Sequence, residues 1–151
     1  MKFHPPNKLF TRVYRKVLYR PMKDVILLLT TTGRKTGKLH TIGLQYELID
    51  GRYYLGAADG TRADWYRNIL KNPAVEIQVG EKSIPATATV ICESEEITDF
   101  LMYRLKKRPL MIGLILRLDG IKGKLDRAAI RGYAAHVGLV ILTPTPAQTP
   151  A

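Results

Sequence analysis

The chain has 151 residues, of which 46% are hydrophobic, as expected for one folded domain with a substantial core. The formal net charge of +11 excludes an ordinary neutral surface and indicates an anionic partner: a phosphorylated cofactor, a nucleic acid or an acidic membrane surface. The alternative is a generally basic, soluble surface without such a partner. Because Cys92 is the only cysteine, the chain cannot form an internal disulfide, and we expect a reducing, cytoplasmic compartment. The longest apolar run, within residues 110–118, is too short to span a bilayer.

The N-terminal residues 7–20 have the pattern of an amphipathic helix, with an apolar stripe and a basic face. The stripe consists of Leu9, Phe10, Val13, Tyr14, Val17 and Leu18. Such a helix covers a sheet or lies on an anionic membrane, and both readings stay open. We therefore divide the chain into a basic helix (1–22), a folded domain (23–143) and a Pro/Thr-rich disordered tail (144–151).

The middle of the chain is rich in strands, and helices are concentrated toward the end. Hydrophobic patterns and turn signals predict strands at 24–32, 41–49, 52–58, 74–79, 82–92 and 137–142. Helices are predicted at 62–71, 94–107, 109–118 and 126–135. Strands that follow one another without alternating helices favour an antiparallel α+β fold or a small barrel over a Rossmann fold.

A loop between the first two predicted strands reads T-T-T-G-R-K-T-G-K-L-H-T over residues 30–41. Gly33 and Gly37 can adopt positive φ, and Arg34, Lys35 and Lys38 supply positive charge, so the loop can bind an anion. It is not a Walker A loop, because three residues rather than four separate the glycines and a strand follows. The alternative is a solvated basic hairpin loop without a ligand.

A second candidate region, residues 56–68, reads G-A-A-D-G-T-R-A-D-W-Y-R-N. The small residues at its start would let a flat ligand approach the backbone closely. Arg62 could meet an anion or a polar ring edge. Trp65 offers a stacking plane but more often packs in a core, and Asn68 is equally a buried structural amide or a ligand contact.

No residue stands out as a catalytic acid, base or nucleophile. His4, His40 and His136 are scattered, without the spacing of metal ligands, so we predict no metal site. The catalytic residues are left unassigned, and any chemistry is expected to come from a bound cofactor.

Two motifs together resemble the deazaflavin-dependent nitroreductase family of split-barrel oxidoreductases. They are L-L-L-T-T-T-G-R-K-T-G-K at 27–38 and D-W-Y-R-N-I-L-K-N-P at 64–73, followed by V-E-I-Q-V-G at 75–80. The resemblance implies an α+β fold, a six-stranded antiparallel split β-barrel of the FMN-binding type surrounded by helices. It also implies the deazaflavin coenzyme F-420, whose tail carries a phosphate and glutamates.

The resemblance further implies which residues bind the coenzyme. The phosphate would be held by Arg34, Lys35, Thr36 and Gly37, with Lys38 and His40 beside them. The deazaflavin ring would be lined by Ala57, Ala58, Asp59 and Gly60, with Arg62, Trp65 and Asn68 shaping the pocket. His40 stands where relatives often have Arg.

The expected reaction is hydride transfer from reduced F-420 to a flat hydrophobic acceptor such as a quinone, an enone or a nitroaromatic. The apolar residues Met111, Ile112 and Ile115 would form the substrate pocket. Since split barrels commonly dimerise, a homodimer is also expected. Two alternatives stay open: the same fold using FMN, and a basic module that binds membrane or nucleic acid without catalysis. Nucleic acid is the less favoured partner, because aromatic residues do not interleave with the cations.

Overall fold

The computed structural model describes residues 24–57 and 62–146. The predicted helix at 7–20, residues 58–61 and the end of the tail lie outside the described residues. Within the described residues there are seven strands: β1 (Ile26–Thr32), β2 (Leu39–Gln45), β3 (Glu47–Ile49), β4 (Arg52–Ala57), β5 (Ala74–Val79), β6 (Lys82–Ile91) and β7 (Gly138–Pro144). The described part also contains the helices α3 (Asp64–Lys71), α4 (Ser94–Lys107), α5 (Pro109–Leu118) and α6 (Arg127–Ala134).

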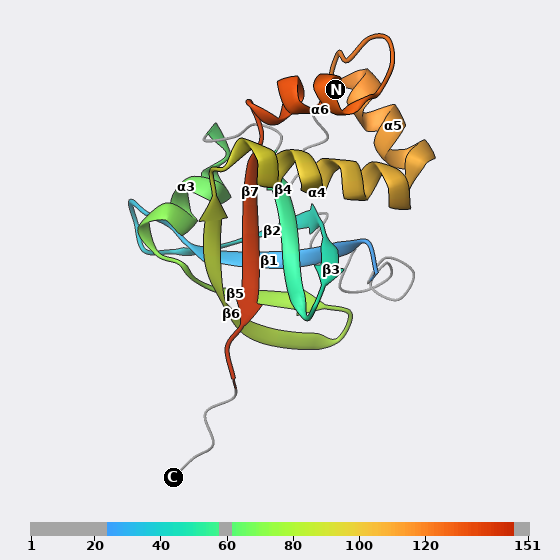
Figure 1. The fold of residues 1–151 in the computed structure, drawn as a ribbon. Coiled ribbons are helices and arrows are strands. Elements are labelled where there is room, and N and C mark those ends of the chain that lie inside the picture. Colours follow the sequence, from blue (N-terminus) through green and yellow to red (C-terminus); the bar gives the residue numbers. More distant parts are fainter. Residues whose placement is uncertain (1–23, 58–61, 147–151) are drawn as a thin grey trace.

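The strands form one antiparallel sheet in the order β2-β1-β5-β6-β7-β4-β3, which curls into a half-barrel (Figure 1). This confirms the predicted antiparallel α+β barrel. The strand predicted at 41–49 is divided at Tyr46 into β2 and β3, which is why seven strands are found where six were expected.

Tyr46 closes the barrel. β2 and β3 are the two edges of the sheet, yet they are consecutive in the chain, with Tyr46 between them. Its main-chain N–H donates to the carbonyl of Val25 at 3.0 Å, and its buried ring lies 5.5 Å from the ring of Tyr53 on β4. The chain therefore passes from one edge to the other through a single buried aromatic residue.

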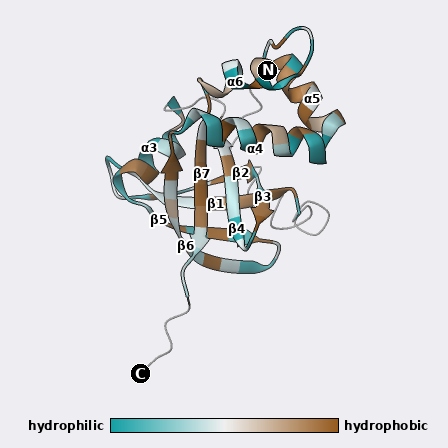
Figure 2. Ribbon diagram, viewed as in Figure 1, coloured by the Kyte–Doolittle hydropathy of each residue, from teal (hydrophilic) through white to brown (hydrophobic). Residues whose placement is uncertain are grey.

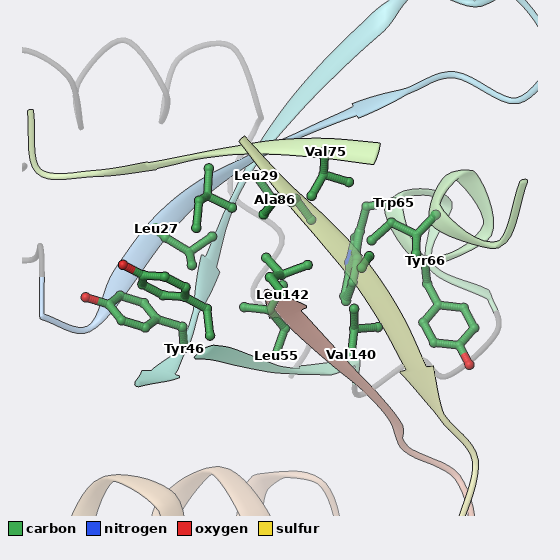
Figure 3. Close-up of a cluster of buried hydrophobic side chains, with 14 of the residues drawn as sticks. Leu27, Leu29, Tyr46, Leu55, Trp65, Tyr66, Val75, Ala86, Val140 and Leu142 are labelled. Carbon is green, nitrogen blue, oxygen red and sulfur yellow. The ribbon is translucent and has the colours of Figure 1, made fainter. Parts of the chain in front are cut away.

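The inner face of the barrel is a hydrophobic core (Figure 3). Leu27 and Leu29 from β1 face Leu55 from β4 and Leu142 from β7, and all four side chains are essentially inaccessible to solvent. Alternation along these strands directs every second side chain inward. Trp65 of α3 is 7% exposed and belongs to the same core, so α3 is anchored to one end of the barrel.

A second hydrophobic cluster joins α4, α5 and α6 at one end of the sheet. It contains Phe100 and Leu101 from α4, Ile112 and Leu116 from α5, and Ile130 from α6. In Figure 1, α4 crosses the ends of β7 and β4, while α5 and α6 lie beyond it. These three helices therefore cover one end of the sheet and extend the fold away from the barrel on that side.

A buried carboxylate connects β3 to the end of α4. Glu47 is 1% exposed, and its carboxylate lies 3.0 Å from Lys107 Nζ and 3.5 Å from the Nε atoms of Arg104 and Arg108. Burial lowers the pKa of Arg104, whereas the hydrogen bond to Glu47 raises that of Lys107. A buried charge of this kind is tolerated only because it is paired, so the carboxylate fixes where α4 ends relative to the sheet.

The last strand runs further than the sequence predicted. β7 continues through Thr143 to Pro144, and Thr145 N donates to the carbonyl of Pro85 at 2.8 Å. The predicted tail boundary fell inside this strand because a Thr-Pro repeat is more typical of unpaired chain than of a strand. Pro85 lies just outside the β6–β7 ladder, whose first pair along β6 is Ala86 with Pro144. The missing N–H of Pro85 therefore removes no donor from that ladder.

Candidate functional site

The loop at 33–38 between β1 and β2 is closed by its own backbone. Gly33 N donates to the carbonyl of Lys38 at 2.7 Å, and Gly37 N donates to the carbonyl of Gly33 at 2.9 Å. Gly37 has a φ of +72°, as the sequence predicted. The same prediction for Gly33 was wrong, since its φ is not positive; a Cβ there would lie 3.1 Å from the Lys38 carbonyl oxygen and 2.9 Å from Nε2 of the exposed His40, whose side chain would have to shift.

Arg34 ties this loop to α3. Its Nη1 atom and its main-chain N–H donate to Asn68 Oδ1 at 3.0 and 3.2 Å, and Nη2 lies 3.1 Å from Asp64 Oδ1. Lys71 Nζ donates to the Arg34 carbonyl at 3.0 Å. Both guanidinium arms therefore face protein groups, so Arg34 positions the loop.

Asn68 is the centre of this network. Its side chain is buried, its oxygen accepts both Arg34 bonds, and its nitrogen donates to Thr31 Oγ1 at 3.1 Å. Asp64, Asn68 and Lys71 follow at intervals of four and three residues, which places them on one face of α3. That spacing is visible in the sequence. The partners of Asn68 and Lys71, which are Thr31 and the Arg34 carbonyl, could not be predicted from it.

The outer edge of the loop presents hydrogen-bond donors. Lys35, Thr36, Lys38 and His40 are exposed. Within the described part of the chain, the main-chain N–H groups of Lys35 and Thr36 donate to no other group, whereas Lys38 N donates to Thr36 Oγ1 at 3.3 Å. Ammonium, amide and hydroxyl donors on a rigid turn fit a phosphate group.

The second candidate region is only partly described. Ala57 is buried at the end of β4, Arg62 is exposed just before α3, and Ala58, Asp59 and Gly60 lie outside the described residues. The ring of Trp65 packs edge-on to Tyr66 at 6.1 Å inside the core. Of the predicted ring-binding residues, the structure brings Asn68 against the loop through its bonds to Arg34 and places Trp65 in the barrel core, and both are buried.

Tyr66 was not singled out by the sequence. A Cβ on Gly138 of β7 would lie 2.7 Å from the Tyr66 ring. The strand and α3 therefore approach so closely here that only glycine fits without a shift. Burial raises the pKa of the Tyr66 phenol, and Cys92 adds to this increase. No sequence signal pairs two residues so far apart in the chain.

The predicted substrate-pocket residues lie elsewhere. Ile112 is 2% exposed in the cluster of α4, α5 and α6, and Met111 and Ile115 pack against that cluster. Figure 1 shows α5 on the other side of the molecule from α3 and the 33–38 loop. The structure therefore does not bring these three residues together with the predicted phosphate site. The described residues also contain no group of three metal-binding side chains.

Solved structures place this fold in a known class. An F420-H2-dependent reductase (FDR-A) matches with a TM-score of 0.53 and 26% identity, covering 78% of this chain and 92% of that one. A protein solved as a domain-swapped dimer has a TM-score of 0.55 at 23% identity, over 91% and 99% of the two chains, and shows the fold alone. The class is the split β-barrel of F-420-dependent reductases.

The family follows from the sequence profile. The profile described as "F420H(2)-dependent quinone reductase" matches residues 8–108, and the chain belongs to this family, whose cofactor is coenzyme F-420. A relative from Mycobacterium tuberculosis, "F420H(2)-dependent quinone reductase Rv1261c", is 46% identical over 65 residues, 41% of this chain and 44% of the relative. The matched stretch thus spans less than half the length of the curated relatives. The resemblance found in the two sequence motifs is confirmed.

Proposed function

We propose that this protein binds coenzyme F-420 through the 33–38 loop and reduces a quinone with it. The observation that carries the proposal is the donor edge of Lys35, Thr36 and Lys38, held rigidly to α3 by Arg34 and Asn68. Rigid donors favour a bound anion because little freedom is lost on binding.

Each residue of the loop has a separate task in this proposal. Lys35, Thr36 and Lys38 hold the phosphate of the coenzyme tail, with His40 at the edge of the loop. Arg34 holds the loop in place, and Gly37 provides its turn. The small residues Ala57, Ala58 and Gly60, with Asp59 and Arg62, line the ring.

When bound, reduced coenzyme F-420 supplies a hydride. The protein orients the ring, excludes water from it and leaves one face open to the acceptor. A quinone is the first candidate acceptor because the family carries that name, and enones and nitroaromatics are flat alternatives. We do not assign the acceptor pocket to α5, since Ile112 is a core residue.

The test is titration of F-420 into the protein, followed by oxidation of the reduced coenzyme with soluble quinones, enones and nitroaromatics. Lys35→Ala with Lys38→Ala should weaken F-420 binding at least about tenfold, because a hydrogen bond to a charged group contributes about 1.5–3 kcal/mol. The matched control is Lys122→Ala with Lys124→Ala, which removes the same charge from exposed positions elsewhere. Equal affinities for both double variants would contradict the phosphate assignment.

FMN is the second cofactor candidate, because its phosphate suits the same donors. Competition between FMN and F-420, read from absorbance spectra that differ visibly, separates the two. A protein that binds FMN and not F-420 would overturn the coenzyme proposal. We also propose a homodimer, as in the solved relative that forms one, and light scattering on the full chain tests it.

A further inference from the structure

Three leucines form an exposed ridge along α5. Leu110, Leu114 and Leu118 are 89%, 60% and 56% exposed. They follow at intervals of four residues, so they share one face over about 12 Å of helix. The opposite face packs Ile112 and Leu116 into the core, so α5 is apolar on both sides. Figure 2 shows brown segments on α5 beside the teal end of α4.

Exposed cations flank this leucine ridge along the sequence. Residues 106–124 contain six Lys and Arg and a single Asp. Lys106, Arg117, Lys122 and Lys124 are exposed, and the carboxylate of Asp119 accepts a hydrogen bond from the Tyr133 hydroxyl at 2.7 Å. An apolar helix face bordered by cations has the composition of a segment that lies in the interface of an anionic bilayer.

We propose that α5 is a membrane-docking helix, which inserts the leucine ridge among anionic lipids while the flanking cations contact the headgroups. This inference does not depend on the cofactor or on the reaction. It also differs from the membrane contact expected of residues 7–20, because other residues carry it.

Charge favours a bilayer over two other occupants. A second copy docked through the same face would bring like charges together, which opposes association. Residues 1–23 carry seven Lys and Arg and no Asp or Glu, so the same repulsion opposes their docking on this ridge. Negative headgroups would instead neutralise the cations around the leucines.

The first experiment is co-sedimentation of the full-length protein with vesicles. We expect binding to phosphatidylcholine vesicles that contain phosphatidylglycerol, weaker binding at raised salt, and little binding to phosphatidylcholine alone. Replacing Leu110, Leu114 and Leu118 together with Gln should lower the partition coefficient at least about tenfold, since burying even one leucine is worth about that factor. Leu70→Gln, at a leucine of α3 that is 58% exposed, is the matched control and should bind like the wild type.

Three results would overturn the proposal. They are no binding of the wild type to anionic vesicles, equal binding of the triple variant, and a dimer that becomes a monomer in the triple variant. The last would show that a second copy covers the ridge. Because the leucines are exposed, the triple variant should unfold at the wild-type temperature.

A second variant tests the same idea without removing the ridge. Trp65, the only tryptophan of the chain, is buried in the barrel core. A tryptophan introduced on α5 would therefore be the one whose fluorescence responds to contact with lipid. The emission of Leu114→Trp should shift to the blue when anionic vesicles are added. Unchanged emission would place the helix outside the bilayer and contradict docking.

Discussion

At the scale of single residues, Asn68 joins three elements with one side chain. It accepts from Arg34 in the loop and donates to Thr31 on β1, while α3 carries its backbone. Its amide is buried, so each of these bonds replaces water that cannot reach the site. The loop that presents Lys35 and Lys38 therefore depends on a residue that does not itself face the ligand.

Asn68→Ala tests this dependence. We expect a loss of about 1–3 kcal/mol in the free energy of unfolding, because Thr31 and Arg34 would be left without their buried partner. F-420 affinity should fall as well, because the loop would lose its anchor. Urea denaturation measures the first effect and coenzyme titration the second. Asn72→Ala, at the end of the same helix, should leave affinity unchanged, and an equal loss there would contradict the anchoring role.

Residue roles were only partly readable in the sequence. The motif around Arg34 predicted a basic anion site, and the exposed Lys35 and Lys38 agree with it. It did not predict that the Arg34 guanidinium donates hydrogen bonds to Asn68 and Asp64, since these bonds depend on where α3 packs against β1. Close approaches such as Gly33 with His40 are likewise set by tertiary structure.

At the scale of elements, a surface network holds α6 to α4. Arg127 Nη2 lies 2.8 Å from Glu95 Oε2 and 2.7 Å from Asp99 Oδ1, and Arg131 Nε lies 2.7 Å from Glu95 Oε1. Hydrogen bonds from Arg127 and then Arg131 lower the pKa of the Glu95 carboxyl below its ordinary value of 4.5. Two cations thus share one carboxylate at the start of α4.

This network predicts a pH dependence of stability. A carboxyl whose pKa is lowered by folding stabilises the folded state at pH values above its pKa in the unfolded chain, here 4.5. This stabilisation is lost as the pH falls through the lower pKa of the folded state. Glu95→Gln should therefore be less stable than the wild type near neutral pH, and the difference should vanish in acid. Thermal unfolding across the pH range measures it. The exposed neighbour Glu96→Gln is the control, and a pH-independent difference for Glu95→Gln would contradict the network's role.

Helices and strands were more readable than contacts. The helices predicted at 94–107 and 109–118 match α4 and α5, because Pro109 separates two clear apolar patterns. The division at Tyr46 was not predicted, since Gln45 and Glu47 continue an ordinary strand pattern. The break lies where the chain crosses from one edge of the sheet to the other, which depends on the order of all seven strands.

At the scale of the whole molecule, the closure at Tyr46 should matter more than its single ring suggests. Tyr46→Ala removes the aromatic contact with Tyr53 and opens a space between the two edges of the sheet. We expect a loss of about 3–5 kcal/mol in the free energy of unfolding, typical of truncating a buried aromatic side chain. Guanidinium denaturation measures this loss. Tyr103→Ala, at a tyrosine that is 40% exposed, is the control, and a similar loss in both variants would contradict a special role for the closure.

The position of β7 has a consequence for how the protein is made. β7 is the last of the strands that the structure describes, yet it lies between β6 and β4 in the sheet. During synthesis, the group β2-β1-β5-β6 and the hairpin β3–β4 emerge first, each with an edge that only β7 can pair. Both edges stay unpaired until residues 138–144 have been synthesised. Pairing between strands so far apart in the sequence is also intrinsically slow. The nascent chain is therefore most prone to aggregation in the interval before its final strand is released.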